Sequence, residues 1–293
     1  MIPYFEVPSL PIPRTSVAIH AFGVLVALGI VLGVAQVLRR GRQLGLDPYA
    51  LSSMCTWGIA VGFVISHLFD VAFYQPQVIH GLAQAFVGAA MGGPLGRQHH
   101  VEDFGRHLFT LLNPGAGLSS FGGFLGMAVG ILLWRWRQRQ PLRPFLDAAV
   151  YGGTTGWLLG RLGCFTAHDH PGKLTEFFLA VDFGQHEPGG VRHDLGLDEA
   201  LFTLGLVIAD RLLIRRPRPA GFYIAMTALA YGPARFLLDF LRIADERYLG
   251  LTPAQWGCLA LTACGLAEAL RLRRGAATPP APPAAAAHGT TPP

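Results

Sequence analysis

Charged residues are scarce in this chain. Asp, Glu, Lys and Arg together make up 14% of its 293 residues, whereas soluble domains average about 25%. With 51% hydrophobic residues and several long apolar runs, this shortage argues against an ordinary soluble domain and places the chain among membrane proteins. The formal charge of +5 does not indicate a nucleic-acid partner, because the basic residues lie in short clusters between apolar segments.

Cysteine is scarce as well. Four are present, all in or at the edge of apolar runs: Cys55, Cys164, Cys258 and Cys264. None belongs to a Cys-x-x-Cys pair, so the spacing indicates neither a disulfide framework nor a zinc knuckle. No Gly-x-x-x-x-Gly-Lys-Ser/Thr motif is present either, which removes the usual sign of a nucleotide site. We expect no cofactor.

Long apolar segments dominate what is present. A helix that crosses a hydrocarbon core needs about 20 apolar residues. The sequence therefore predicts an all-α, polytopic membrane protein with seven transmembrane helices in one domain over residues 1–274. These helices are expected near 16–38, 52–74, 112–134, 146–167, 198–214, 220–240 and 253–271. A Gly-rich apolar segment at 79–92 is expected to be interfacial or re-entrant, and the polar residues 99–103 are expected to form a loop.

Arginine clusters follow every second predicted helix. They lie at 39–42, 135–143, 215–218 and 271–274. Cytoplasmic loops carry an excess of Lys and Arg, so the clusters predict an external N-terminus and a cytoplasmic C-terminus. The remaining segment, 275–293, consists mainly of Ala, Pro, Gly and Thr, cannot bury a core and is expected to be a disordered cytoplasmic tail.

Polar residues inside the predicted helices fall near the external face. Arg161 ends a run without charge, and Arg235, Asp239 and Arg242 share one helical face at spacings of four and three. A guanidinium stays charged in proteins and is costly at membrane depth unless an anion or a water-filled cavity meets it. One interpretation is an internal Arg–Asp pair. The other is an anion site, because one aspartate leaves two arginines without a partner.

Histidines raise two further questions. The stretch His168-Asp169-His170 has spacing that metal sites use, although a solvated loop at the mouth of a cavity is the other interpretation. A metal site could also recruit His67 and His193. His67 and Asp70 lie three residues apart within an apolar segment. They are either a structural hydrogen-bonded pair or a histidine oriented by a carboxylate as a general base.

At these residues the chain resembles the bacterial prolipoprotein diacylglyceryl transferase family. The family's Gly-Arg-x-Gly-Asn-Phe signature is similar to residues 160–165, including Arg161 and Gly163. Its Arg-His-Pro-Ser-Gln-Leu-Tyr-Glu stretch resembles 192–199, which ends at Glu199. Its Tyr-Gly-x-x-Arg…Glu-Phe-x-Arg helix resembles the segment from Tyr231 to Arg242. The resemblance covers residues 16–271 in order.

The resemblance implies transfer of a diacylglyceryl group from phosphatidylglycerol to the lipobox cysteine of a prolipoprotein signal peptide. It implies a multi-pass protein of the bacterial inner membrane that contacts membrane lipid. Arg161 and Arg235 are expected to clamp the phosphate, with Arg242 nearer the mouth, while Glu199 and Asp239 orient the arginines. Tyr231, Gly163 and His170 are expected to line the lipid site.

The chain departs from the family at four positions, and the residues replaced by Phe121 and Phe22 are the ones that the resemblance implicates in handling protons. The family's loop histidine falls on Phe121, its first-helix tyrosine on Phe22, its signature asparagine on Cys164, and the arginine of its second helix on His67. A thiol is a poor nucleophile until it loses its proton. We therefore expect a histidine to accept that proton, with His67 as first choice and His168 or His170 as second. A lipid-binding relative without transferase activity is the alternative function.

Overall fold

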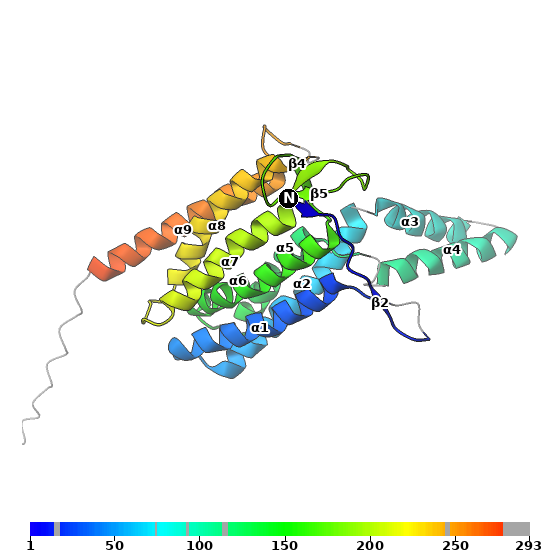
Figure 1. The fold of residues 1–293 in the computed structure, drawn as a ribbon. Helices are drawn as coiled ribbons and strands as arrows, with labels where there is room; N and C mark the ends of the chain where they lie inside the picture. Colours follow the sequence, from blue (N-terminus) through cyan, green and yellow to red (C-terminus); the bar gives the residue numbers. More distant parts are fainter. Residues whose placement is uncertain (15–17, 74, 92–93, 113–116, 244–246, 278–293) are drawn as a thin grey trace, which may run out of the picture. The chain divides into compact units, whose positions relative to one another are not determined.

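The computed structural model describes residues 1–293 except 15–17, 74, 92–93, 113–116, 244–246 and 278–293. The described part is mostly helical (Figure 1). Its helices are α1 (Ala21–Gln43), α2 (Pro48–Phe73), α3 (Pro76–Met91), α4 (Pro94–Leu112), α5 (Ser120–Gln138), α6 (Leu142–Ala167), α7 (Leu195–Leu213), α8 (Phe222–Leu238), the 3-10 turn η2 (Asp239–Leu241) and α9 (Pro253–Ala277).

Each of the seven predicted transmembrane segments coincides with one of these helices, namely α1, α2, α5, α6, α7, α8 or α9. Among the described residues, three helices are long and apolar enough to cross a membrane: α1, α2 and the continuous stretch Phe222–Leu241. The other four are shorter in apolar run or carry more charge, as α7 does with Asp210 and Arg211. The membrane character predicted from composition is confirmed, and the seven-span topology stays a prediction.

Two of the helix starts were predicted well before their observed positions. The first helix begins at Ala21 rather than residue 16, because Ala18–Ile19 form strand β3, paired with β2 (Leu10–Pro11). The third begins at Ser120 rather than residue 112, which ends α4. The Ser119 side chain caps α5 by accepting a hydrogen bond from the Gly122 backbone N–H at 3.3 Å. A hydrophobic run alone does not mark such a cap.

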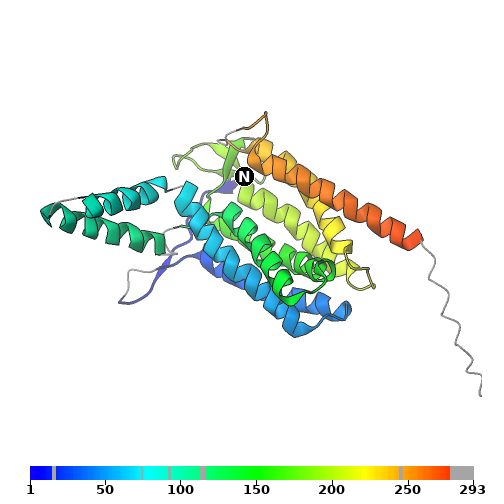
Figure 2. The ribbon, with the colours of Figure 1, turned by 180° about the vertical axis from the view of Figure 1, so that it is seen from behind.

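The segment between the second and third predicted spans is more helical than expected. Residues 99–103 were expected to form a loop but lie within α4, which packs beside α3 (Figure 2). Residues 79–91 lie within α3, and the interfacial or re-entrant placement of that segment stays a prediction. The α4 sequence mixes Arg, His, Glu and Asp with apolar residues, so hydropathy gave no signal for it. Residues 275–277 continue α9 instead of starting the predicted tail, and the rest of that tail lies outside the described residues.

The described residues form two compact units: residues 34–152, and residues 1–33 together with the described residues from Gly153 onward. The single domain over residues 1–274 stays a prediction. In the unit of residues 34–152, α2 and α5 form the main helix pair. Gly122, Gly126 and Gly130 recur every four residues on α5 and so share one face. A Cβ at Gly130 would lie 2.4 Å from the Trp57 carbonyl oxygen. Small residues therefore let the two backbones approach closely.

We expect Gly130→Ala to destabilise the protein by about 1–3 kcal/mol, because the added methyl group would overlap backbone that cannot move independently. The measurement is the unfolding midpoint of the purified protein in detergent. Gly153→Ala in α6 is the matched control, since nothing lies within 4 Å of its Cβ position. Equal midpoints for the two variants would contradict the close α2–α5 packing.

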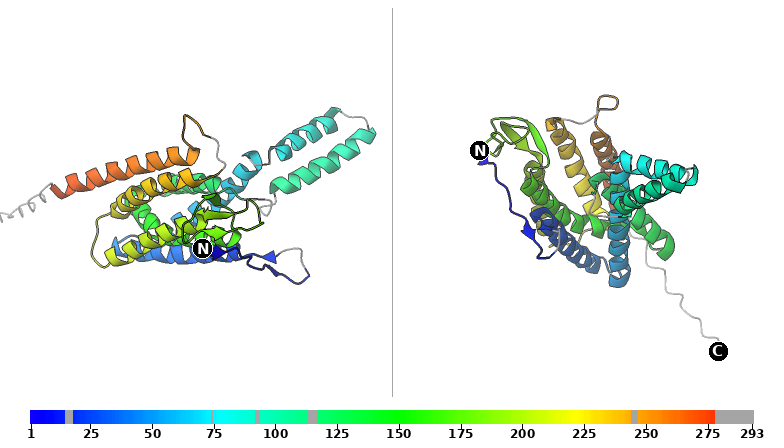
Figure 3. Two further views of the ribbon diagram at one scale, coloured as in Figure 1. Left: turned by 45° about the horizontal axis from the view of Figure 1, so that its top comes forward. Right: turned by 90° about the vertical axis from the view of Figure 1, so that its right-hand side faces the viewer.

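The other unit contains a small sheet that organises the helix ends. Its strands, in the order β1-β5-β6-β4, are Ile2–Pro3, Val181–Asp182, Val191–Asp194 and Pro171–Leu174. Strand β1 is parallel to β5, so the N-terminus lies beside the segment between α6 and α7. A bridge between Gly172 and Arg242 links this segment to the end of η2. Helix α8 packs along α9 (Figure 3). The sheet thereby brings the end of α6 and the start of α7 to the end of α8.

Candidate functional site

The Glu199 carboxylate lies between two arginines. Its Oε2 is 3.1 Å from Arg161 Nε and 3.4 Å from Arg235 Nε. The three side chains come from α6, α7 and α8, and each is at most 12% exposed. The structure therefore brings together Arg161, Arg235 and Glu199, which the resemblance implied for one site.

The second oxygen of Glu199 is held by two aromatic side chains. Trp157 Nε1 donates to Glu199 Oε1 at 2.9 Å, and the Tyr231 hydroxyl donates to the same oxygen. Trp157 Nε1 also lies 2.9 Å from the Tyr231 hydroxyl oxygen. The Arg161 guanidinium carbon lies 4.3 Å from the centre of the Trp157 ring, a cation–π contact. Glu199 and Trp157 together fix the orientation of the Arg161 side chain.

Asp239 fixes Arg235 from the other side. Arg235 Nη1 donates to Asp239 Oδ1 at 2.8 Å, and the Thr252 hydroxyl donates to Asp239 Oδ2. Gln255 in turn accepts from the Thr252 backbone N–H at 3.0 Å. Asp239 is 1% exposed. Its carboxylate is thus anchored to the start of α9, and Arg235 is held by carboxylates from two directions.

The charge count behind the anion interpretation needs a correction. Counting one aspartate left two arginines without a partner, but Glu199 pairs with both Arg161 and Arg235. Burial of a guanidinium is costly without such compensation. Arg161, Arg235, Glu199 and Asp239 therefore amount to two positive and two negative charges. Affinity for an anion has to come from N–H groups that these carboxylates leave unused.

Arg161 has such unused donors. Its Nη1 makes only a weak contact with Cys164 Sγ at 3.9 Å, and none of the described residues accepts a hydrogen bond from Nη2. Its Nε is close to Glu199, yet that contact lacks the direction of a hydrogen bond. A guanidinium carries five N–H donors. Arg161 is therefore a buried, oriented cation with hydrogen-bonding capacity left for a ligand.

Gly163 and Arg242 occupy the surroundings of this cluster. A Cβ at Gly163 would lie 2.9 Å from Phe22 Cδ2, so α6 and the first turn of α1 are in close contact here. Arg242 follows η2 and is half-buried; its backbone N–H donates to the Asp239 carbonyl oxygen at 3.2 Å. Arg242 therefore lies three residues beyond Asp239, at the end of the turn that follows α8.

His67 belongs to the other unit, and its hydrogen bonds favour the structural interpretation. Nδ1 lies 3.1 Å from the Gly117 carbonyl oxygen, and Nε2 lies 2.8 Å from the Leu111 carbonyl oxygen. Asp70 instead accepts from Gln75 Nε2 at 2.8 Å, so the predicted His67–Asp70 pair is not formed. A ring nitrogen that faces a carbonyl oxygen is a donor and does not accept a proton there. The side chain of Phe121 lies outside the described side chains.

His168, His170 and His193 each contact a different aspartate. His168 Nδ1 lies 2.7 Å from Asp194 Oδ2, and His193 Nδ1 lies 2.9 Å from Asp198 Oδ2. His170 is hydrogen bonded to its neighbour Asp169. Among the described residues, one group has metal-ligand spacing, with its atoms within 4.8 Å of one another: Cys164, Asp169 and His170. The Arg161 guanidinium beside Cys164 opposes a divalent cation there.

Asp194 joins the sheet to α7. Its Oδ1 accepts from the Leu197 backbone N–H at 3.2 Å, which caps the helix. Burial raises the pKa of the Asp194 carboxyl, while the hydrogen bonds from His168 and the backbone lower it. The sequence did not single out Asp194 as a functional residue, nor Trp157, Thr252 or Gln255 as supports of the cluster. Nothing in an apolar run marks which tryptophan will meet a carboxylate.

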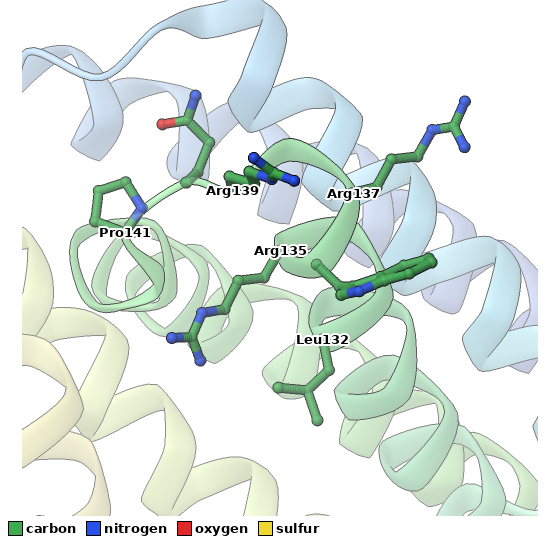
Figure 4. A pocket seen from close by; sticks show the side chains of 7 residues that line it. Leu132, Arg135, Arg137, Arg139 and Pro141 are labelled. Carbon is green, nitrogen blue, oxygen red and sulfur yellow. The ribbon is translucent and has the colours of Figure 1, made fainter.

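Two of the hollows in the described structure lie in different units. The larger, of about 940 Å³, lies where α5 ends and has three arginines, among them Arg135 and Arg137, which point in different directions (Figure 4). Its lining contains no carboxylate or histidine, which leaves it without a proton acceptor. The smaller, of about 280 Å³, is bounded by the N-terminal segment, the first turn of α1 and the end of α6, including His168.

The chain is similar to known proteins along most of its length. The family model of prolipoprotein diacylglyceryl transferase matches residues 11–271. Phosphatidylglycerol–prolipoprotein diacylglyceryl transferase of Methylobacillus flagellatus is 28% identical over 256 residues, which cover 86% of this chain and 91% of that protein. The enzyme of the same name from Bordetella parapertussis is 27% identical and covers 90% of this chain and 95% of its own. The chain therefore belongs to the prolipoprotein diacylglyceryl transferase family.

Proposed function

We propose that this protein transfers the diacylglyceryl group of phosphatidylglycerol to the cysteine thiol of a prolipoprotein signal peptide. The observation that carries the proposal is Arg161, a buried guanidinium oriented by Glu199 and Trp157, with N–H donors that no described residue uses. A planar guanidinium suits the oxygens of a phosphate. Family membership and the names of the relatives supply the reaction class.

The proposed chemistry uses the charge that develops on the leaving group. The acceptor sulfur attacks the glyceryl carbon that carries the phosphate, and the bond between this carbon and the phosphate oxygen breaks. The departing glycerol phosphate gains a second negative charge. Arg161 stabilises that charge with fixed N–H donors. Arg235, whose Nε lies 3.4 Å from Glu199 Oε2, adds a second positive charge to the site. Because Glu199 and Asp239 already hold the two guanidiniums, little reorganisation accompanies the step.

The membrane placement is part of the proposal. Seven helices would span the bacterial inner membrane with the N-terminus outside, as the arginine clusters indicate. The Arg161–Glu199–Arg235 cluster would then lie toward the outer leaflet. Phosphatidylglycerol would enter from this leaflet with its acyl chains against apolar helix faces, and the signal peptide would approach from the same side.

The decisive experiment combines purified protein, phosphatidylglycerol and a lipobox peptide. Mass spectrometry of the peptide is expected to show one thioether-linked diacylglyceryl group, with an equal amount of glycerol phosphate released. A peptide with serine in place of the lipobox cysteine, and phosphatidylcholine as the lipid, are the controls. Retention of phosphatidylglycerol without any product would instead assign the chain to lipid binding alone. Growth of a bacterium depleted of its own transferase is the cellular counterpart.

Cys164 offers a gain-of-function prediction. The family has asparagine at this place in its signature, and here Arg161 Nη1 meets only a sulfur, at 3.9 Å. We expect Cys164→Asn to supply an amide oxygen to that donor and to hold Arg161 more firmly. A hydrogen bond of this kind is worth about 1 kcal/mol, or roughly five-fold in kcat/KM. Cys264→Ser, at an exposed cysteine of α9, is the control and should change nothing.

A further inference from the structure

His168 occupies a place in the backbone that disfavours a side chain. It follows the end of α6 with a φ of +49°, in the left-handed region. A residue other than glycine costs roughly 1 kcal/mol in this region. The side chain is nevertheless buried, with 4% of its surface exposed. A costly backbone conformation combined with a buried imidazole indicates that this side chain has a role of its own.

The two nitrogens of His168 have different surroundings. Nδ1 lies 2.7 Å from Asp194 Oδ2, and because an ionised carboxylate only accepts, Nδ1 carries the hydrogen. Nε2 then holds a lone pair. It is buried, and no described residue is its hydrogen-bond partner. A buried polar atom without a partner costs about 1–3 kcal/mol, so such atoms call for an explanation.

Aromatic rings surround the imidazole on several sides. Ring centres lie 4.9 Å away for Tyr4, 4.7 Å for Phe5 and 5.7 Å for Phe183. Asp194 is 1% exposed and is fixed as the cap of α7. The ring therefore has one orientation, set by the carboxylate on Nδ1 and by the aromatic contacts. This is the arrangement in which a carboxylate orients a histidine for proton transfer.

The cavity of about 280 Å³ borders His168 and extends toward Phe22. Glu6 and His20 are the other titratable groups in its lining besides Tyr4. Phe22 touches Gly163, two residues from Arg161. The cavity thus adjoins the helix end that carries the proposed phosphate site. The cavity has room for a small side chain such as that of cysteine. Its aromatic lining suits the apolar residues that flank the cysteine in the peptide.

We propose that His168 is the proton acceptor for the thiol of the incoming peptide and that Asp194 is its positioning residue. This inference rests on the proposed function. His168 Nε2 takes the thiol proton, the sulfur forms its bond to the glyceryl carbon, and the electrons of the broken C–O bond leave on glycerol phosphate. The imidazolium stays beside the Asp194 carboxylate until the proton returns to water.

The test uses the acidity of the nucleophile. His168→Gln keeps a polar side chain of similar size, so we expect it to retain phosphatidylglycerol but to lose about 100-fold in transfer to a cysteine peptide. A selenol is ionised at neutral pH and does not need a base. With a selenocysteine peptide, His168→Gln is therefore expected to come within a few-fold of the unaltered protein. Asp194→Asn should show the same pattern to a smaller extent.

His193→Gln is the matched control, because His193 also bonds an aspartate through Nδ1 near the start of α7. It should transfer to both peptides at the rate of the unaltered protein. Equal loss with both peptides in His168→Gln would indicate a structural role and overturn the inference. The inference would also be overturned if the selenocysteine peptide restored transfer in His170→Gln but not in His168→Gln. Failure of the unaltered protein to transfer to either peptide would refute the proposed function instead.

Discussion

Arg161→Ala is expected to lower the rate of diacylglyceryl transfer by about 10²–10³-fold, the range seen when one fixed donor to a developing anion is removed. The guanidinium is 8% exposed and is oriented by Glu199 and Trp157. An alanine removes the donors nearest the proposed leaving group. It also leaves Glu199 with Arg235 as its remaining ion-pair partner. The measurement is kcat/KM with phosphatidylglycerol and a lipobox peptide.

Two further variants separate geometry from charge. Arg161→Lys keeps the positive charge but loses the planar fork and the stacking over Trp157, so most of the loss should remain. Arg215→Ala removes an exposed arginine between α7 and α8 and should leave the rate unchanged. Full activity of Arg161→Ala in protein that unfolds at the normal midpoint would refute the phosphate clamp. Equal losses of rate in Arg161→Ala and Arg215→Ala would instead attribute the effect to the overall positive charge of the protein.

The sequence predicted the helices better than it predicted the short strands and contacts that hold the helix ends together. Seven apolar runs located seven helices, because a long apolar segment bounded by polar residues favours a helix that buries it. The four-stranded sheet escaped prediction, since strands of two to four residues have too little periodicity to detect. Its position matters nonetheless, because strand β6 ends at Asp194, which both caps α7 and holds His168.

The candidate site likewise contains residues that the sequence identified and residues that it missed. Motif order identified Arg161, Glu199 and Arg235, and the structure places them in contact. The role expected for His67 depended on a partner three residues away, but carbonyl oxygens from more than 40 residues away occupy both ring nitrogens. Thr252, which donates to Asp239, lies in a stretch with no motif. Contacts between distant segments depend on packing, which a local pattern does not encode.

A second large effect, on stability rather than on transfer, is expected at the ion pair between α1 and α6. Arg40 Nε and Nη2 both donate to Asp147 Oδ2, at 3.1 and 2.8 Å. The side chains are 1% and 0% exposed. They lie close in sequence to Val37, Phe145 and Ala148, members of the apolar core of the unit of residues 34–152. A buried charge that loses its partner keeps the full cost of its desolvation.

Asp147→Ala should therefore lower the free energy of unfolding by about 3–5 kcal/mol, measured by titration of mixed micelles with a denaturing detergent. The double replacement Arg40→Met with Asp147→Leu removes both charges and fills their space with apolar groups. Replacements of that kind are often neutral or stabilising, so the double variant should unfold close to the unaltered protein. A double variant as unstable as Asp147→Ala would mean that this pair contributes specific bonds that apolar packing cannot replace. Recovery of stability would instead identify the Arg40 charge, deprived of the Asp147 carboxylate, as the source of the loss.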